Sequence, residues 1–244
     1  MSQPGFAADW PAPPGVRTWQ TVRAGGVSTG TWASLNLAGH VGDRPEDVAG
    51  NRARLKSAVG LPAEPVWLNQ VHGSRVLRPD DGETGSADAA ITAKPGVVLA
   101  VMTADCLPVL LARADGGQIG VAHAGWRGLV AGVLEAAIAA FDGAPGELMA
   151  WLGPAIGRDA FEVGDEVQAA FVAADPGAGI HFTRNARGRW QANLDALARR
   201  RLLAAGVAAI HGHPVCTHAD PIRYFSHRRE APCGRMATLI WRER

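Results

Sequence analysis

The most apolar stretch of the chain, GVVLAVMTADCLPVLLA at residues 96–112, places the strongest limit on the fold. Thr103, Asp105 and Pro108 interrupt it, so the stretch is too short and too broken to cross a bilayer. Its pieces VVLAVMT and PVLLA each have the length of a strand. The nearby segments DAAIT and IGVAHA are also short, mostly apolar runs that predict strands. We therefore expect a group of short buried strands.

Helical segments surround this group of strands. DRPEDVAGNRARLKSAVG predicts a helix with Asp43 as its N-cap, Pro45 in its first turn and Gly60 after its end. GLVAGVLEAAIAAF, GDEVQAAFVAA and NLDALARRRLLAAG predict further helices, whereas RYFSHRR and RMATLIW, joined by EAPCG, predict a C-terminal antiparallel hairpin. Because the strands come in runs instead of strict βαβ alternation, the pattern favours an α+β fold in which helices cover an extended sheet system.

The composition predicts one globular domain over residues 1–244, with residues 1–16 as an irregular lead-in. The net charge of +1 creates no global attraction to nucleic acid or to an anionic membrane. The N-terminal residues lack the basic and apolar regions of a signal peptide, and three cysteines without a CxxC pair favour a reducing compartment. We expect a cytoplasmic protein without an obligate protein partner.

Three candidate metal ligands share one local context. His72, Cys106 and His123 each end an apolar run and precede a Gly or Pro turn. If their strands are neighbours, two imidazoles and one thiolate converge and suit zinc, with a fourth position left for water. Because the spacing matches no local finger pattern, a structural cysteine and two satisfied turn histidines are the alternative from the residues alone.

The segment HGHPVCTH is a rival cluster of metal-binding residue types. It contains His211, His213, Cys216 and His218, and Pro214 interrupts it. Histidines two residues apart share a face only on a regular strand. A polar surface turn is therefore the favoured interpretation of this segment.

Several arginines are candidates for binding an anion. Arg52 falls on the same helical stripe as Val48 and Leu55, where a buried guanidinium needs an anion or a ring of carbonyls, unless its head reaches solvent. Arg127 in HAGWRG stands at the predicted start of a helix, whose free N–H groups favour anions. The paired arginines of SHRRE are further candidates, although adjacent strand residues point to opposite faces.

A series of short motifs then resembles one known family. The motifs RAGGVSTG, SLNLAGHVGD, NRARL, NQVHG, DAAIT, TADCLPVLLA, HAGWRGL, GPAIG, FEVGDEV, CT and GRMATLIW occur in this order between about residues 20 and 242. Together they are similar to the multicopper-polyphenol-oxidase-like, or laccase-domain, family, also called the YfiH-type purine nucleoside phosphorylase or peptidoglycan editing factor family. TADCLPVLL and HAGWRGL are the most specific of these motifs.

The resemblance implies a fold, a metal and a reaction. It implies a single-domain layered α+β sandwich related to bacterial toxin deamidases, and a zinc ion held by His72, Cys106 and His123. It further implies phosphorolysis of adenosine, inosine, guanosine and methylthioadenosine, adenosine deamination, and a link to peptidoglycan editing. A laccase needs many paired histidines and this chain has eight in total, so copper and polyphenol oxidation are the less favoured alternative.

Roles for further residues follow from this chemistry. Asp105 and Glu162 are candidates for moving a proton. Either is alternatively a carboxylate that holds a ligand histidine, and this alternative is favoured for Asp105. Arg23, Arg52 and Arg127 are candidates for binding phosphate through charge-assisted hydrogen bonds.

Two other functions remain open from the sequence. One is a metal-free cysteine hydrolase that acts on an amide, with Cys106 as nucleophile and His123 as base. The other is a non-catalytic binding protein with a structural metal.

Overall fold

The structure, a computed structural model, describes residues 4–243 and arranges most of their strands in two stacked sheets. The six-stranded sheet has the spatial order β13 (Ala209–His211), β9 (Leu148–Leu152), β7 (Leu107–Arg113), β8 (Ile119–Ala124), β5 (Ala89–Thr92) and β4 (Val76–Leu77). The five-stranded sheet has the order β1 (Gly5–Phe6), β2 (Val16–Thr21), β14 (Met236–Arg242), β6 (Val98–Thr103) and β3 (Val66–Trp67). Both sheets mix parallel and antiparallel pairs, which confirms the α+β class.

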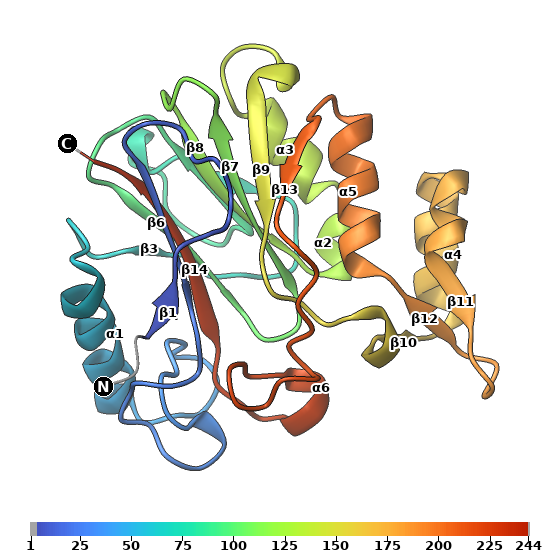
Figure 1. The fold of residues 1–244 in the computed structure, drawn as a ribbon, viewed down its shortest axis with the longest axis horizontal. Helices are drawn as coiled ribbons and strands as arrows, with labels where there is room; N and C mark the ends of the chain where they lie inside the picture. Colours follow the sequence, from blue (N-terminus) through green and yellow to red (C-terminus); the bar gives the residue numbers. More distant parts are fainter. Residues whose placement is uncertain (1–3, 244) are drawn as a thin grey trace.

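Helices cover the outer faces of both sheets, so the body has four layers (Figure 1). α1 (Pro45–Val59) lies on the five-stranded sheet, while α2 (Trp126–Val130), α3 (Val133–Ala139) and α5 (Leu194–Ala204) lie on the six-stranded sheet. Short 3₁₀ turns complete the connections: Gly30–Trp32, Pro79–Asp81, Pro145–Glu147, Arg158–Ala160 and Pro176–His181.

The two faces of β7 show why polar residues do not alternate with apolar ones along the buried strands. Leu110 and Ala112 belong to the core between the sheets, whereas Val109 and Leu111 belong to the core under the helices. A strand that is buried on both faces needs apolar residues at every position. The apolar stretch at 96–112 therefore forms β6 and β7, one strand in each sheet, and the chain crosses between the sheets at residues 104–106.

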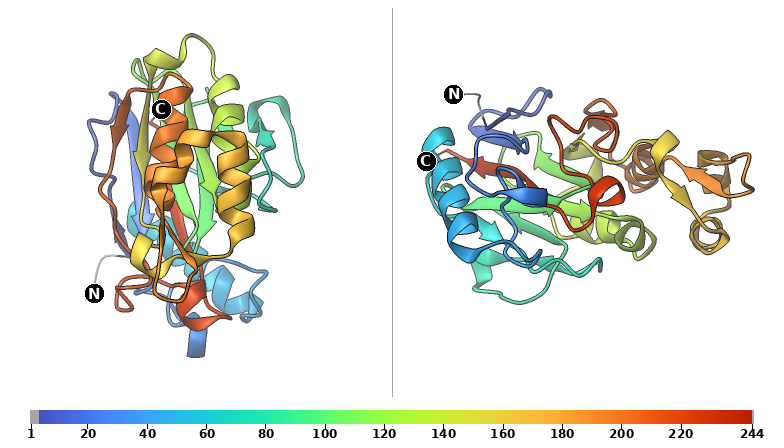
Figure 2. Two further views of the ribbon diagram at one scale, coloured as in Figure 1. Left: turned by 90° about the vertical axis from the view of Figure 1, so that its right-hand side faces the viewer. Right: turned by 90° about the horizontal axis from the view of Figure 1, so that it is seen from below.

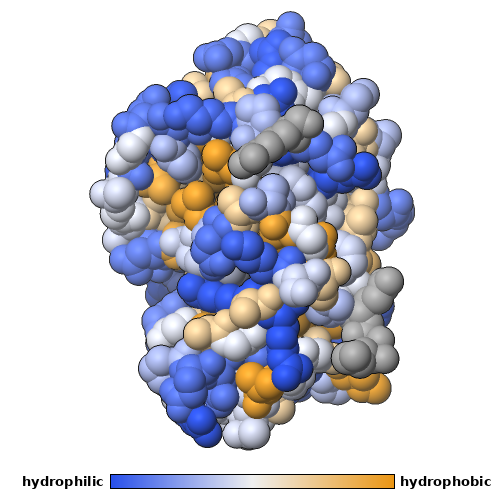
Figure 3. Space-filling view, turned by 90° about the vertical axis from the view of Figure 1, so that its left-hand side faces the viewer, coloured by the Kyte–Doolittle hydropathy of each residue, from blue (hydrophilic) through white to orange (hydrophobic). Residues whose placement is uncertain are grey.

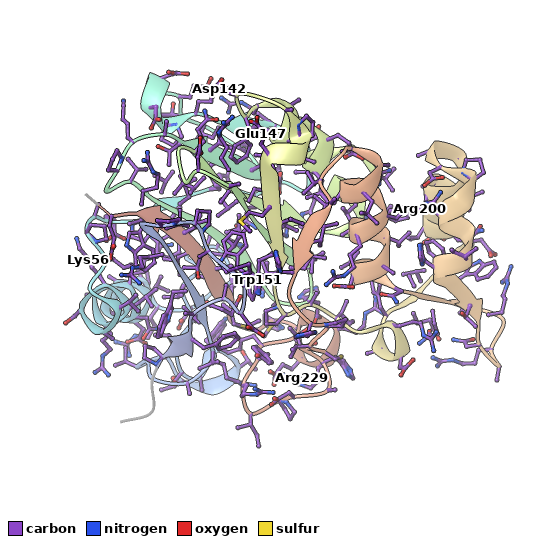
Figure 4. All side chains as sticks on the ribbon, turned by 45° about the horizontal axis from the view of Figure 1, so that its top comes forward. Lys56, Asp142, Glu147, Trp151, Arg200 and Arg229 are labelled. Atoms are coloured by element: carbon purple, nitrogen blue, oxygen red, sulfur yellow. The ribbon has the colours of Figure 1, made fainter. Side chains whose placement is uncertain are left out.

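A smaller unit extends from this body. It contains α4 (Asp165–Ala174) and a three-stranded sheet of β10 (Glu162–Val163), β12 (Trp190–Ala192) and β11 (Phe182–Arg184). Figure 2 shows it projecting beyond α5 when the molecule is seen from below. Arg200 lies between α5 and the α4 region in Figure 4, where it forms an ion pair with Asp175.

Several sequence-based expectations were wrong in detail. The N-cap of α1 is Arg44, because Asp43 bonds instead to Ser28 and Asn36. The helix expected over GLVAGVLEAAIAAF is divided into α2 and α3 at Gly132, whose φ of 86° is left-handed. The lead-in at residues 1–16 contains the short strand β1, which pairs with β2.

The expected C-terminal hairpin does not form. Residues 236–241 of RMATLIW are in β14, but this strand pairs with β2 and β6. Residues 227–229 of the other expected strand, together with Glu230 of the expected connection, form the short helix α6 (His227–Glu230). The hydroxyl of Ser226 caps that helix by accepting from the backbone N–H of Arg229. Arg229, labelled in Figure 4, belongs to α6, and its guanidinium donates to the carbonyls of Thr217, His218 and Tyr224.

Within residues 4–243 no helix has the length and apolar character that a membrane crossing requires. Figure 3 shows the left-hand side of Figure 1, where α1 lies, as a mixture of hydrophilic residues and small hydrophobic patches.

Candidate metal centre

Three side chains from distant parts of the chain meet at one end of the stacked sheets. His72 lies on the connection from β3 to β4, Cys106 on the connection from β6 to β7, and His123 within β8. Their ligand atoms all lie within 4.8 Å of one another, and we call these residues the ligand cluster. Two of the donors thus lie on connections that cross from the five-stranded to the six-stranded sheet, whereas the third is anchored in a central strand.

Asp88 organises two of the three ligands. Its carboxylate is fully buried and accepts hydrogen bonds from the backbone N–H groups of Val71 (3.1 Å), His72 (2.9 Å) and Gly73 (2.7 Å). It also pairs with Nδ1 of His123 at 2.8 Å. One carboxylate therefore fixes both the loop that carries His72 and the ring of His123.

The backbone at His72 has the conformation that lets three successive N–H groups donate to Asp88. His72 has a φ of 60°, a left-handed value that is uncommon for a residue with a side chain. Such a value turns successive N–H groups toward one point, where they form an anion-binding nest. The side chain of Gln70 holds the same loop by exchanging two hydrogen bonds with the backbone of Met102 on β6. The nest thus binds a carboxylate of the same chain.

The hydrogen bond to Asp88 fixes how His123 presents its ring. Because Nδ1 faces Asp88, Nε2 is the nitrogen left for the ligand cluster. Nε2 of His72 lies 3.8 Å from Sγ of Cys106, and the two imidazole rings meet edge to face with centroids 4.8 Å apart. The cluster therefore brings together two imidazole nitrogens and one sulfur.

Charge interactions within the cluster outweigh the effect of burial. Burial alone favours the neutral thiol, but the charge of His123 and hydrogen bonds from both histidines lower the pKa of Cys106 to about 6. Burial alone favours neutral His123, but the Cys106 thiolate and the Asp88 carboxylate raise the pKa of His123 to about 9. Near neutral pH the metal-free cluster is accordingly a thiolate beside an imidazolium.

The donors and the space around them fit a metal ion. Two imidazoles and one thiolate are ligands that zinc prefers, and blue-copper centres use the same three donors. A Cβ atom at Gly125 would lie 2.9 Å from Sγ of Cys106 and 3.0 Å from Cδ2 of His72. Only a glycine leaves this side of the cluster open. His72 is exposed and Cys106 is half-buried, so the cluster is accessible to small molecules.

Asp105 has a different set of partners from the one expected. Its buried carboxylate accepts from the hydroxyls of Thr217 (2.7 Å) and Ser226 (3.0 Å) and from the backbone N–H of Arg228 (2.7 Å). The expectation that Asp105 holds a ligand histidine was wrong, because Asp88 has that contact. Asp105 instead ties the segments around residues 217 and 226–228 to the backbone next to Cys106.

The other predicted site residues lie in several places. The carboxylate of Glu162, on β10, contacts Asn185 and Arg187. Burial acts to raise its pKa, but the hydrogen bonds from these two partners and the charge of Arg187 outweigh burial and lower the pKa. Arg23 donates to the carbonyls of Ala33 and Pro221 and pairs with Glu230.

Arg52 and Arg127 differ in the contacts that their guanidinium groups make with the rest of the protein. Arg52 donates twice to the carbonyl of Leu37 and stacks on Trp67, so it meets carbonyl oxygen as the helical stripe required. Arg127 is exposed, stacks on Trp126, and lies two residues after Gly125 at the edge of the cluster.

The rival segment HGHPVCTH takes no part in the cluster. His211 ends β13, and Cys216 accepts a hydrogen bond from the backbone N–H of Gly157. Within residues 4–243, the ligand cluster is the one group of three or more donors close enough together to hold a metal.

Asp88 is the site residue that sequence reasoning missed. It begins the DAAIT run, which was interpreted only as a strand. A carboxylate directly before AAIT, a strand with three apolar residues out of four, was the available signal, because a buried charge needs partners.

The fold and the cluster define an α+β protein with a His–Cys–His centre. The chain belongs to the family described as multi-copper polyphenol oxidoreductase laccase, whose model matches residues 17–243. A purine nucleoside phosphorylase of Xylella fastidiosa strain 9a5c is 51% identical, over 97% of this chain and 96% of the relative. The purine nucleoside phosphorylase YfiH of Escherichia coli K12 is 48% identical, over 95% of this chain and 96% of the relative.

Solved structures show the same fold. The crystal structure of the Neisseria meningitidis protein NMB0706 matches with a TM-score of 0.94 and 47% identity, and the match covers 99% of this chain and all of that one (100%). The crystal structure of YlmD from Geobacillus stearothermophilus matches with a TM-score of 0.90 and 31% identity, over 96% of this chain and 94% of that one.

Proposed function

We propose that this protein is a zinc-dependent purine nucleoside phosphorylase of the cytoplasm. The observation that carries the proposal is the ligand cluster, in which His72, Cys106 and His123 converge within 4.8 Å around an open side at Gly125. The names of relatives at about half identity support the reaction class. The proposed substrates are adenosine, inosine, guanosine and methylthioadenosine, together with inorganic phosphate.

In phosphorolysis, a phosphate oxygen forms a bond to C1′ of the ribose while the bond from C1′ to N9 breaks. The electron pair of that bond passes to the purine, which takes up a proton and leaves as the free base. A zinc ion held by the ligand cluster would supply Lewis-acid activation at the reacting oxygen. Asp88 would keep both histidines in position throughout the reaction.

Other residues would bind phosphate and move the proton. Arg127 is the best placed of the three candidate arginines, since Arg23 and Arg52 already donate to backbone carbonyls. Glu162 and Asp105 are the proposed proton-transfer residues. The side chain of Glu162 is 27% exposed and can exchange protons with solvent, whereas Asp105 is buried beneath three donors.

We further propose that the same centre deaminates adenosine. Water would add at C6 of the purine and ammonia would leave, which requires a nucleophilic oxygen at neutral pH. A link to peptidoglycan editing would then be a cellular consequence of this purine chemistry.

The test is an assay of the purified protein with adenosine and inosine, with and without phosphate. Chromatography should detect adenine or hypoxanthine with ribose 1-phosphate only when phosphate is present, and inosine from adenosine without it. Treatment with a chelator should abolish both reactions, and restoring zinc or copper separately should identify the active metal. Absence of every product from the untreated, metal-loaded protein would refute the proposal.

The arrangement of Cys106, His123 and Asp88 favours one second candidate, a metal-free cysteine hydrolase acting on an amide. A thiolate beside an imidazolium that a carboxylate orients is the arrangement of a cysteine nucleophile and its base. In that case amide hydrolysis would survive the chelator and fail only after alkylation of Cys106. A structural metal in a binding protein would instead show a lower melting temperature on chelation without any turnover to lose.

A further inference from the structure

A small cavity lies along the segments that adjoin Cys106 and Asp105, and none of the three ligand residues is in its lining. It has a volume of about 190 Å³, and its walls include Leu107, Ile156 and Cys216. Leu107 directly follows Cys106 in the chain, and the backbone N–H of Ile156 donates to the carbonyl of Asp105. The cavity is therefore built on the residues that flank a metal ligand.

The size and lining of the cavity suit a flat heteroaromatic ring. Drug-sized ligands occupy pockets of roughly 300–1,000 Å³, so a volume of about 190 Å³ fits one ring system with the rest of the ligand outside. Ala155, Ile156 and Val215 give apolar walls, and the polar side chains of Asn193 and Asp195 join them from the start of α5.

The two polar side chains keep complementary atoms for a ligand. Oδ1 of Asn193 caps α5 by accepting from the backbone N–H of Ala196, which leaves its Nδ2 donor for another partner. Oδ2 of Asp195 pairs with Nε of Arg199 at 2.8 Å, and this contact does not use Oδ1. The cavity lining thus offers one N–H donor and one carboxylate acceptor from residues two apart at the start of α5.

We propose that this cavity binds the purine base, with Asn193 and Asp195 bonding to its edge; the inference rests on the proposed function. Adenine presents the N7 acceptor beside the N6 amino donor on one edge, whereas guanine presents two acceptors, N7 and O6, on that edge. Asn193 donates to N7 in every purine. Asp195 accepts from a 6-amino group and is repelled by a 6-oxo group, so it selects adenosine over inosine and guanosine.

Kinetics with two substrates tests the assignment. Asp195→Asn should lower the ratio of kcat/KM for adenosine to that for inosine by about tenfold, because an amide can donate to O6. Asn193→Ser keeps a helix-capping oxygen and removes the amide donor. It should lower kcat/KM for both nucleosides by about tenfold and leave their ratio unchanged.

Arg199→Gln is the matched control for Asp195. It breaks the same ion pair but keeps the carboxylate, so the ratio between the two substrates should stay at the wild-type value. An Arg199→Gln variant with the altered ratio, or an Asp195→Asn variant without it, would overturn the proposal. Melting temperatures of all three variants show whether each one is folded.

Equilibrium binding separates this inference from the proposed function. Calorimetry with free adenine and metal-free protein measures the cavity alone, without turnover. We expect adenine to bind the wild type and to bind Asp195→Asn about tenfold more weakly. If no nucleoside is converted but adenine binds in this pattern, the proposed function fails and the cavity assignment stands. If adenine does not bind, or binds both proteins equally, the cavity assignment fails.

Discussion

Asp88 and Asp105 are both buried near the ligand cluster, yet they hold different segments of the chain. Asp88 bonds to the amides around His72 and to the ring of His123, so both of its partner segments carry ligands. Asp105 bonds to Thr217, Ser226 and Arg228, which belong to segments without ligands. One carboxylate therefore supports the metal donors, and the other supports the surrounding walls.

The difference between these carboxylates shows that proximity in the chain is a poor guide to function. Asp105 is adjacent to Cys106, but its left-handed backbone, with a φ of 89°, leads its carboxylate to the segments at 217 and 226–228. Asp88 is 16 residues from His72 and 35 from His123 and contacts both. Substitutions of the two carboxylates should therefore affect metal binding and stability differently.

The largest effect should follow removal of one of the three donors that the two carboxylates surround. Cys106→Ala leaves two imidazoles and should reduce zinc affinity and phosphorolysis by more than the roughly 10–100-fold that loss of an outer partner costs. Elemental analysis and the phosphorolysis assay measure both effects. Cys233→Ala is the control, since that thiol is buried in a separate core cluster and zinc should stay at the wild-type amount.

The next effect tests the comparison itself. Asp88→Asn replaces two acceptor oxygens by one oxygen and an N–H₂ group that faces other donors. We expect zinc affinity to fall by about 10–100-fold, measured by competition with a chelating dye.

Asp105→Asn is the matched variant for that measurement. It should lose about 1–3 kcal/mol of unfolding free energy, because donors are left unpaired, while zinc affinity changes little. Equal losses of zinc affinity in the two variants would show that the carboxylates do not differ in this way.

The pH dependence of Cys106 alkylation is a second measurement that should distinguish Asp88 from Asp105. Because the folded protein lowers the pKa of Cys106 to about 6, alkylation of metal-free protein should rise with a midpoint near that pH, and mass spectrometry of the modified peptide measures it. Asp88→Asn weakens the charge on His123 and should move the midpoint upward, whereas Asp105→Asn should not. A wild-type midpoint near the ordinary thiol range contradicts the charge pairing in the cluster.

The smallest effect concerns phosphate. Arg127→Gln should raise the KM for phosphate by about tenfold, as expected for one charge-assisted hydrogen bond. Arg52→Gln should leave that KM unchanged, because its guanidinium is occupied by Leu37 and Trp67. The reverse result would move the phosphate site to the five-stranded sheet and α1.

The sequence predicted local elements better than the contacts between them. Strands β5 to β8 and helices α1, α4 and α5 follow from apolar runs and turn residues that act over short distances. The hairpin prediction failed because a long-range contact decides the structure there: Asp105 binds Ser226 and Arg228 and supports α6.

The same limit applies to the candidate centre. The residues alone nominated His72, Cys106 and His123 without bringing them together, and family resemblance supplied their grouping. Their grouping depends on two sheets stacking, which no local pattern encodes. No sequence pattern identifies the partners of Asp88, because they are mostly backbone amides, which every residue except proline possesses.

His72 and Cys106 lie on connections between the two sheets, so the order in which the chain folds decides when all three donors meet. A chain with only the β7–β8 pair formed presents Cys106 and His123 but lacks His72, whose loop is anchored to β6 by Gln70. Asp88, which precedes β5 of the six-stranded sheet, holds the same loop, so the full set of contacts around His72 uses both sheets. A zinc ion bound as proposed would then be captured late in folding, and it would stabilise a fold that is already formed instead of nucleating one.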